Sequence, residues 1–270
     1  MNPLFNLKGK IALITGGGGV LGSNMARTLA KQGVITGILG LSIEKAEATA
    51  TSVRDNGGEA FAISANVTNK EELEKVKDFI LEKYGRLDIL INCAGGNKSG
   101  AIVGPDDAMY NMKLDDLQQV LDLNIIGTML PSQVFSEIFA KQKSGVIINI
   151  SSPTAQRPLS RVAGYSAAKA AIDNFTKWMA VELAGKYGEG IRVNAISPGF
   201  FIGEQNKALL LKPDGNLTPR GEKIINQTPM GRFGVPQDTD GVLLFLCSDM
   251  SKFVTGITIN IDGGFGASSI

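Results

Sequence analysis

The chain has 270 residues, 43% of them hydrophobic, and its 27 basic and 26 acidic side chains leave a formal net charge of +1. That length and apolar content suffice for one large α/β domain. The net charge is close to zero and there is no basic run, which argues against a nucleic acid as partner. The sequence contains no histidine, which excludes Ser-His-Asp and Cys-His nucleophilic schemes and most zinc chemistry. We therefore expect no metal site, and any acid or base to be Tyr, Lys, Asp or Glu.

Apolar runs of strand length alternate with longer segments of helical period along the chain. Strands are predicted at 10–15, 34–40, 59–65, 87–92, 145–151, 190–196 and 256–261. Helices are predicted at 20–32, 43–56, 69–84, 114–142, 163–187 and 236–249, the fourth being long enough for two helices. This alternation predicts an α/β fold of the Rossmann type: a doubly wound parallel sheet of about seven strands between two helix layers, with ligands at the carboxyl ends of the strands.

A glycine cluster follows the first predicted strand. The apolar run Ile11–Thr15 leads into Gly16, Gly17, Gly18 and Gly19, and a helix-like segment follows. Glycines let the backbone come close to a pyrophosphate, and the next helix offers unpaired N–H groups and the positive end of its dipole. A plain strand-to-helix turn would have the same composition, so the interpretation as a dinucleotide site depends on the rest of the chain.

The stretch from Ser197 to about Gly234 departs from the alternation. It is too long for an ordinary connection and contains Pro213, Pro219 and Pro229. Because long loops in compact domains often serve as active-site lids, we predict a substrate-covering insertion at about 197–234 within a single domain of residues 1–270.

Three polar features are candidates for chemistry. Tyr165 and Lys169 lie four residues apart on a predicted helix and so share one face, although a solvated face would produce such a pair by chance. The pair Ser151 and Ser152 ends the apolar strand 146–150, and Asn124 interrupts an apolar helical pattern. A serine at a strand end and a tyrosine with a lysine on a helix suit proton transfer at one cleft.

In the same order along the chain, several motifs resemble the short-chain dehydrogenase/reductase family over essentially the whole length. The matching pieces are Thr15-Gly16 through Gly22, Asn92-Cys-Ala-Gly95, Asn124, Ser152, Tyr165 with Lys169, Asn194 and Pro198-Gly199. The family's serine precedes its tyrosine by thirteen residues, so the resemblance selects Ser152 over Ser151. It implies an NAD(P)-dependent oxidoreductase that moves a hydride between nicotinamide and a carbinol or carbonyl carbon, with Asn124, Ser152, Tyr165 and Lys169 as catalytic residues.

Physical chemistry supports these roles. A phenol has a pKa of about 10, and lowering it to about 7 takes roughly 4 kcal/mol of differential stabilisation. A cation at about 4 Å in an effective dielectric of about 20 offers roughly that amount. We therefore expect Lys169 to activate Tyr165 nearly alone, helped by the positive nicotinamide. Ser152 would hold the substrate oxygen, and Asn124 would anchor a water between Lys169 and solvent.

The resemblance implies NAD or NADP as cofactor. At the end of the second strand there is neither the acidic residue typical of NAD enzymes nor the arginine typical of NADP enzymes, which predicts weak discrimination. Val20 replaces a family glycine, and Asn66 replaces the aspartate beside the adenine, although its amide can still bond the ring. The implied cofactor residues are Gly16, Gly18, Gly19, Val20, Leu21, Gly40, Leu41, Ser42, Asn66, Val67, Ala94, Gly95, Tyr165, Lys169, Pro198, Gly199 and Phe201.

Within the family the chain resembles the D-mannonate oxidoreductase (fructuronate reductase) branch. The similarity lies in Ala94–Asn97, Pro198–Phe201 and Asn216–Arg220, whereas Gly203 stands where that branch commonly has threonine. The resemblance implies a keto or hydroxy sugar acid of the D-fructuronate/D-mannonate type as substrate. The alternatives are a 3-oxoacyl thioester or another polyol or ketone, or a non-catalytic dinucleotide-binding protein of the same fold.

A polyhydroxylated acid requires amide and hydroxyl groups and a cation in the cleft. Arg157 and Lys98 are the candidates for the substrate carboxylate. The expected substrate residues are Asn97, Lys98, Ser152, Thr154, Arg157, Phe200, Glu204 and Asn206.

Cys93 and Cys247 lie in apolar stretches far apart, which favours reduced core thiols over a disulfide. The first ten residues contain no signal-like apolar core, and the longest later apolar run, Val242 to Cys247, is too short to span a bilayer. We therefore expect a cytoplasmic protein without a membrane partner. Tetrameric relatives in the family imply a homotetramer, with apolar faces around Phe175, Trp178 and Val181 and around 253–261 as candidate contacts.

Overall fold

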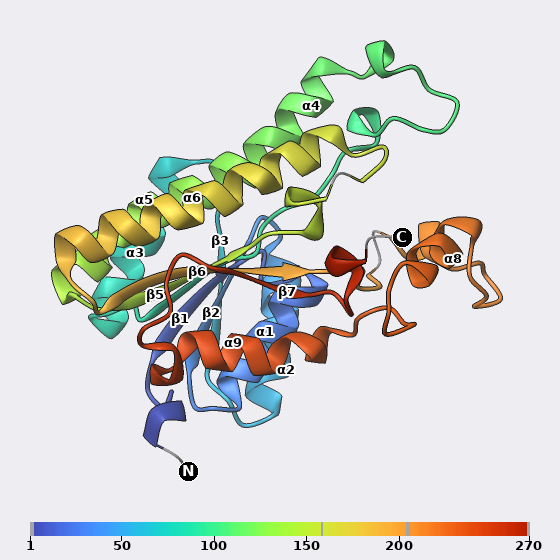
Figure 1. The fold of residues 1–270 in the computed structure, drawn as a ribbon. Coiled ribbons are helices and arrows are strands. Elements are labelled where there is room, and N and C mark those ends of the chain that lie inside the picture. The colour runs from blue at the N-terminus through green and yellow to red at the C-terminus, as the bar shows by residue number, and fades with distance from the viewer. Residues whose placement is uncertain (1–2, 158, 204–205, 269–270) are drawn as a thin grey trace.

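A seven-stranded parallel sheet organises the computed structural model, which describes residues 3–157, 159–203 and 206–268 (Figure 1). The strand order is β3-β2-β1-β4-β5-β6-β7, and every neighbouring pair is parallel. The strands are β1 (Ile11–Thr15), β2 (Ile35–Gly40), β3 (Ala60–Ser64), β4 (Ile89–Asn92), β5 (Gly145–Ile150), β6 (Ile191–Pro198) and β7 (Thr258–Ile261). The order reverses between β1 and β4, the place where ligands bind in doubly wound sheets. The predicted fold class is confirmed.

Helices cover both faces of the sheet. α3, α5 and α6 pack on one face and α1, α2 and α9 on the other (Figure 1). The α-helices are α1 (Val20–Ala30), α2 (Ile43–Asp55), α3 (Lys70–Tyr84), α4 (Leu114–Leu121), α5 (Gly127–Gln142), α6 (Ala163–Tyr187), α7 (Lys207–Leu210), α8 (Pro219–Asn226) and α9 (Asp240–Cys247). The predicted helix 236–249 is shorter than expected, because short 3-10 turns at Pro236–Thr239 and Asp249–Ser251 flank α9.

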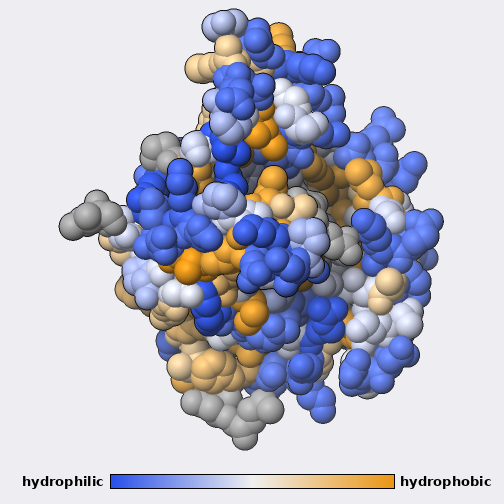
Figure 2. Space-filling model, turned by 90° about the vertical axis from the view of Figure 1, so that its right-hand side faces the viewer, coloured by the Kyte–Doolittle hydropathy of each residue, from blue (hydrophilic) through white to orange (hydrophobic). Residues whose placement is uncertain are grey.

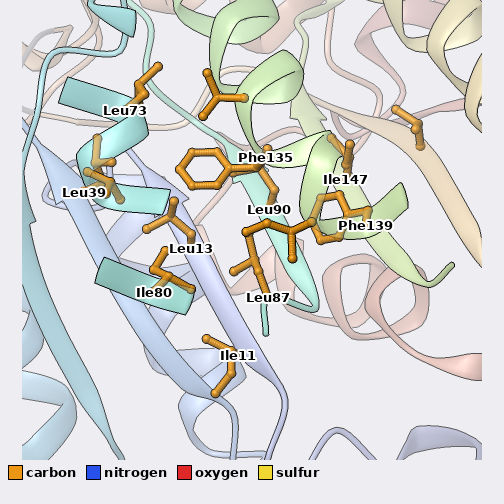
Figure 3. Close-up of a cluster of buried hydrophobic side chains, with 14 of the residues drawn as sticks. Ile11, Leu13, Leu39, Leu73, Ile80, Leu87, Leu90, Phe135, Phe139 and Ile147 are labelled. Atoms are coloured by element: carbon orange, nitrogen blue, oxygen red, sulfur yellow. The ribbon is translucent and has the colours of Figure 1, made fainter. Parts of the chain in front are cut away.

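Alternate strand residues supply two separate cores. Leu13, Leu90 and Ile147 pack with Phe135 and Phe139 of α5 (Figure 3). Their chain neighbours point to the other face, against α1, α2 and α9, since successive strand side chains alternate. Burial on both faces explains why the strands are continuous apolar runs, and it gives the strand ends a rigid platform.

Buried polar side chains cross this core and join strands to helices. Asn92 Nδ2 of β4 donates to Ser132 Oγ of α5 at 2.8 Å and to Asn149 Oδ1 of β5 at 2.9 Å. Asn149 Nδ2 donates in turn to Thr176 Oγ1 of α6 at 2.8 Å. The polar chain Ser132–Asn92–Asn149–Thr176 therefore fixes α5 and α6 relative to β4 and β5.

The long predicted helix 114–142 is two helices joined by a π-helical turn, Asp122–Ile126. Asn124 lies in this turn, and its Nδ2 donates to Val120 O at 2.8 Å and to Gly96 O at 2.7 Å. A side chain that bonds the preceding carbonyl and a distant loop favours local departure from the α-helix. The turn thus places Asn124 beside the loop after β4.

The stretch after β6 contains two helices, α7 and α8, where the sequence suggested a long loop. Thr218 caps α8 by accepting from Gly221 N, and Pro219 occupies its first position. The stretch closes at its base, where Gly234 N donates to Phe200 O at 2.9 Å. In Figure 1, α8 lies beyond the carboxyl ends of the strands.

Candidate active site

The glycine loop after β1 is packed too closely for larger residues. Gly16 has φ +64°, and a Cβ there would lie 2.8 Å from the Ala94 backbone. A Cβ on Gly22 would lie 2.5 Å from Gly16 O. Gly19 precedes α1 without a side-chain cap, so the first-turn N–H groups of Val20 and Leu21 remain available to a phosphate. The loop therefore fits a dinucleotide pyrophosphate.

Hydrogen bonds from Thr15 hold the next loop against this one. The backbone N–H groups of Cys93 and Ala94 both donate to Thr15 Oγ1 at 3.1 Å. A Cβ on Gly95 would meet Asn124 Oδ1 at 2.8 Å and Lys169 Nζ at 3.4 Å. The loop after β4 thus passes between the glycine loop and the buried lysine.

The segment after β2 carries the residues expected at the ribose of the cofactor. Ser42 Oγ accepts from Lys45 N at 3.2 Å and donates to Glu44 Oε2 at 2.7 Å, while Gly40 and the largely exposed Leu41 precede it. Sequence reasoning missed Glu44, which stands four residues after the strand end. Its carboxylate gives this corner a negative charge that disfavours a 2′-phosphate.

Asn66 and Val67 follow β3, where the adenine is expected. Asn66 Oδ1 accepts from Thr68 N and Thr68 Oγ1 at 3.0 and 2.8 Å. In the part of the chain that the structure describes, Asn66 Nδ2 has no hydrogen-bond partner, so it remains a donor for a ring nitrogen. Val67 is buried and lies 2.9 Å from the position of a Cβ on Gly127.

The four expected catalytic residues come together at the carboxyl ends of β4 and β5. Lys169 Nζ lies 5.4 Å from the centroid of the Tyr165 ring and donates to Ile150 O at 2.8 Å. The Ser152 hydroxyl, directly after β5, acts on the Tyr165 phenol and lowers its pKa. Asn124 reaches the same place through Gly95, as described above.

Burial dominates the electrostatics of this pair. Lys169 is only 3% exposed, and burial lowers its pKa to about 8, against the opposing effects of Cys93 and Asp173. Burial also raises the pKa of the Tyr165 phenol, while its hydrogen bond with Ser152 acts in the opposite direction. Desolvation of the phenolate therefore opposes the activation that we expect from Lys169, and it is the largest effect on the Tyr165 pKa.

Asn124 is fully buried, and its side chain is committed to protein partners. Besides its two donated bonds, Asn124 Oδ1 accepts from Gly96 N at 3.3 Å. The side chain therefore clamps the loop after β4. A water relay at Asn124 would use its main-chain carbonyl, which accepts from Thr128 Oγ1 at 2.9 Å.

Arg157 has a different role from the predicted contact with a substrate carboxylate. Its Nη1 donates to Phe265 O at 2.8 Å and to Ser268 O at 2.9 Å. Its guanidinium carbon lies 5.0 Å from the centroid of the Phe265 ring, which packs edge-on against Phe200 at 5.1 Å. Arg157 thus anchors the segment after β7 beside Phe200, and its charge is engaged there.

Thr154 and Ser151 carry unsatisfied hydroxyls close to Ser152. Thr154 N donates to Ser152 Oγ at 3.3 Å. Thr154 Oγ1 and Ser151 Oγ are buried and have no hydrogen-bond partner among the described residues. Such groups normally pair with a ligand or water.

The remaining predicted positions differ in accessibility. Asn206 closes a local turn by accepting from Gly203 N and donating to Phe201 O, both at 2.8 Å, which occupies its amide. The Phe201 ring is buried against Gly234, so only its backbone is offered to a cofactor. Asn97 and Lys98 are exposed, whereas Pro198 is buried and Gly199 packs closely on Asp262. Glu204 lies outside the described residues.

The face at the carboxyl ends of the strands is hollowed, with hydrophobic side chains inside and hydrophilic ones around the rim (Figure 2). Arg161, which the sequence did not single out, immediately precedes the N-cap of α6, the helix that carries Tyr165 and Lys169. Arg161 precedes Tyr165 by four residues, which is the only local signal that could have indicated it.

These features define a dinucleotide-dependent oxidoreductase. A family model described as enoyl-(acyl carrier protein) reductase matches residues 19–266. An oxidoreductase of Bacillus subtilis (strain 168), named as the uncharacterized oxidoreductase UxuB, is 47% identical over 279 residues, covering 100% of this chain and 99% of that protein. The chain belongs to the short-chain dehydrogenase/reductase family.

Solved structures agree with this assignment. A candidate D-mannonate oxidoreductase from Haemophilus influenza with bound NAD gives a TM-score of 0.92 at 40% identity, covering 98% of this chain and 97% of that one. A gluconate 5-dehydrogenase from Burkholderia cenocepacia in complex with NADP and tartrate gives 0.87 at 31% identity and covers 99% of each chain. This protein is therefore an NAD(P)-dependent enzyme acting on CH–OH groups. No helix in the described part of the chain has the length and apolarity needed to cross a membrane.

Proposed function

We propose that the enzyme interconverts a keto sugar acid with its hydroxy acid, with D-fructuronate and D-mannonate as the favoured pair. The observation that carries this proposal is the set of buried, unpaired hydroxyls beside Ser152, namely Thr154 Oγ1 and Ser151 Oγ. A shift of the segment after β5 on binding would bring these hydroxyls to a polyhydroxylated substrate, whereas an apolar acyl chain would offer them no partner. The likeness to a candidate D-mannonate oxidoreductase and to a dehydrogenase holding tartrate supports the same substrate class.

The catalytic roles follow from the geometry. Tyr165 Oη gives its proton to the carbonyl oxygen in reduction and takes one from the hydroxyl in oxidation, and Ser152 Oγ holds that oxygen beside the phenol. Lys169, with a pKa of about 8, can give a proton to the Tyr165 phenolate or take one from the phenol near neutral pH. Asn124 positions the loop after β4. When bound, NAD(P) would supply the hydride in reduction and accept it in oxidation.

The stretch 197–234 is proposed to cover the substrate within one domain. Its start lies against the glycine loop, since a Cβ on Gly203 would be 3.3 Å from Val20 Cγ2. Its end lies against the turn after β7, where a Cβ on Gly264 would be 3.0 Å from Pro229 Cγ. The insertion thus reaches from the expected cofactor phosphate to the wall formed by Phe265.

A substrate screen tests the proposal. Purified enzyme is offered hexuronates with NADH and NADPH, aldonates with NAD and NADP, and acetoacetyl thioesters as the competing class. We expect nicotinamide absorbance to change with a hexuronate or aldonate, and the change to disappear in Tyr165→Phe. Ready reduction of the thioesters with no response to any sugar acid would transfer the assignment to the 3-oxoacyl alternative.

We further propose a cytoplasmic homotetramer. Large apolar side chains lie exposed on α6 and before β7, with Trp178 57%, Val181 76% and Phe253 99% exposed, and such surface favours subunit contact. The free thiols of Cys93 and Cys247 fit a reducing compartment. Light scattering should give a mass of several protomers, and a value near 28.5 kDa at micromolar concentration would contradict the tetramer.

A further inference from the structure

The end of β2 is the corner of the fold where the adenosine ribose belongs. The pyrophosphate is expected at the glycine loop after β1 and the adenine beside Asn66 after β3, and β2 lies between those two strands. Gly17 N donates to Leu39 O at 3.1 Å, and Ala65 N donates to Gly40 O at 3.2 Å, so the end of β2 is bonded to both neighbouring loops. A dinucleotide that reaches from β1 to β3 therefore passes its ribose beside the segment that follows β2.

The first turn of α2 packs directly on the glycine loop. A Cβ on Gly18 would lie 2.9 Å from Lys45 Cβ and 3.1 Å from the Lys45 carbonyl carbon. Only the absence of a side chain at Gly18 permits this approach. The main chain of Lys45 is fixed in the turn, since Lys45 N donates to the hydroxyl of the N-cap residue Ser42 at 3.2 Å. The base of the Lys45 side chain is thus held against the glycine loop.

The Lys45 ammonium is uncommitted. The side chain is exposed, and it forms no hydrogen bond or ion pair with the part of the chain that the structure describes. The adjacent Glu44 carboxylate accepts from Ser42 Oγ at 2.7 Å instead. Lys45 is the only basic residue in the three segments that follow β1, β2 and β3 at this corner, namely 16–19, 41–45 and 65–69. It is therefore the cation that these segments offer to a phosphate on the ribose.

The contact with Gly18 favours the ribose over the pyrophosphate as the target of Lys45. The pyrophosphate has donors of its own, the unpaired first-turn N–H groups of Val20 and Leu21 in α1. Gly18 follows Gly17, whose N–H is bonded to the end of β2. The lysine therefore meets the glycine loop on the side where the ribose belongs.

We propose that Lys45 binds the 2′-phosphate of NADP and thereby lets the enzyme use both dinucleotides. An ammonium on a flexible stem meets a phosphate as a point charge, without the planar geometry that an arginine requires. NAD carries a hydroxyl in place of this phosphate, so Lys45 contributes to the binding of NADP and not to that of NAD. Glu44 acts in the opposite direction, because its charge disfavours the 2′-phosphate. The inference concerns the cofactor and does not depend on which substrate the enzyme takes.

Fluorescence titration with NADH and NADPH measures the Kd of each dinucleotide without turnover. We expect Lys45→Gln to raise the Kd of NADPH about tenfold and to leave that of NADH within about twofold. Lys45→Arg keeps the charge, so the Kd of NADPH should stay within about threefold of that of the unaltered enzyme. Lys31→Gln removes an exposed lysine at the C-terminal end of α1 and should leave both Kd values unchanged.

Calorimetry with adenosine 2′,5′-bisphosphate and adenosine 5′-monophosphate separates the 2′-phosphate from the nicotinamide. The ratio of the two Kd values should fall about tenfold in Lys45→Gln, and in the unaltered enzyme it should fall as salt screens the charges. An equal loss of NADH and NADPH affinity in Lys45→Gln, or no loss of either, would overturn the proposal. An unaltered enzyme that does not bind NADPH would overturn it as well. The proposed sugar-acid function would stand in each of these cases, because the substrate screen can be run with NADH alone.

Discussion

Arg157 holds the segment after β7 against the cleft, and replacing it tests how that wall is built. Its Nη1 bonds two carbonyl oxygens, and its guanidinium lies over the Phe265 ring. Arg157→Met keeps the apolar stem and removes the donors and the charge. We expect Phe265 to Ser268 to leave their position more often, while the sheet remains intact.

The size of the effect follows from these contacts. A hydrogen bond from a charged donor contributes about 1.5–3 kcal/mol, and a cation–π contact at a half-exposed site contributes about 0.5–1 kcal/mol. Because both hydrogen bonds share one nitrogen, we take a combined loss of about 3 kcal/mol, which corresponds to a roughly hundredfold rise in the undocked fraction. Since Phe265 packs on Phe200 at 5.1 Å, undocking removes part of the substrate wall and should raise KM more than it lowers kcat.

Hydrogen exchange of the peptide spanning 262–268, read by mass spectrometry, measures the docking directly. Arg157→Met should accelerate exchange there and leave α1 and β1 unaffected, and Arg157→Lys should show an intermediate rate, because lysine keeps the charge without the planar fork. KM should rise equally for the acid and its carboxamide. If hydrogen exchange of this peptide is unchanged and KM rises for the acid alone, this account is refuted. Arg157 would then contact the substrate carboxylate, as the sequence predicted.

The remaining predictions concern the proton-transferring pair and the cofactor. Tyr165→Phe should reduce turnover at least a thousandfold while NADH affinity, measured by fluorescence titration, stays within a few-fold, and near-normal turnover would contradict the assignment. Below about pH 8 the buried Lys169 is protonated, so the Tyr165–Lys169 pair cannot accept the proton that oxidation releases from the substrate hydroxyl. The value of kcat/KM for oxidation should therefore rise with pH and level off above about 8. Asp173→Asn removes a charge that favours the ammonium form, so the midpoint should move to lower pH, and an unmoved midpoint would exclude this coupling. Glu44 beside Ser42 should give NADH about a tenfold advantage over NADPH that Glu44→Gln narrows, whereas a preference above about a thousandfold would require another charged residue.

Sequence periodicity correctly predicted helices and strands whose position depends on their own residues. The predicted helix 163–187 coincides with α6, and the strand predicted at 145–151 differs from β5 by one residue. Both faces of the sheet are covered, so each strand is a short apolar run that periodicity identifies easily. The spacing of Tyr165 and Lys169 on that helix therefore placed the pair correctly on one face.

Features that depend on distant contacts could not be found in the same way. The π-helical turn depends on the bond from Asn124 to Gly96, 28 residues away. Arg157 is engaged by carbonyls 108 and 111 residues further along the chain, and nothing in its neighbourhood indicates them.

The polar chain Ser132–Asn92–Asn149–Thr176 also affects how the protein responds to heating. It ties α6, which carries Tyr165 and Lys169, and α5, which directly follows the turn that holds Asn124, to the central strands through buried bonds of 2.8–2.9 Å. In an apolar interior such bonds are costly to open one at a time, because each released group stays unsatisfied. The catalytic distances should therefore persist until the sheet itself melts, so that the temperature at which turnover is lost coincides with the temperature of global unfolding.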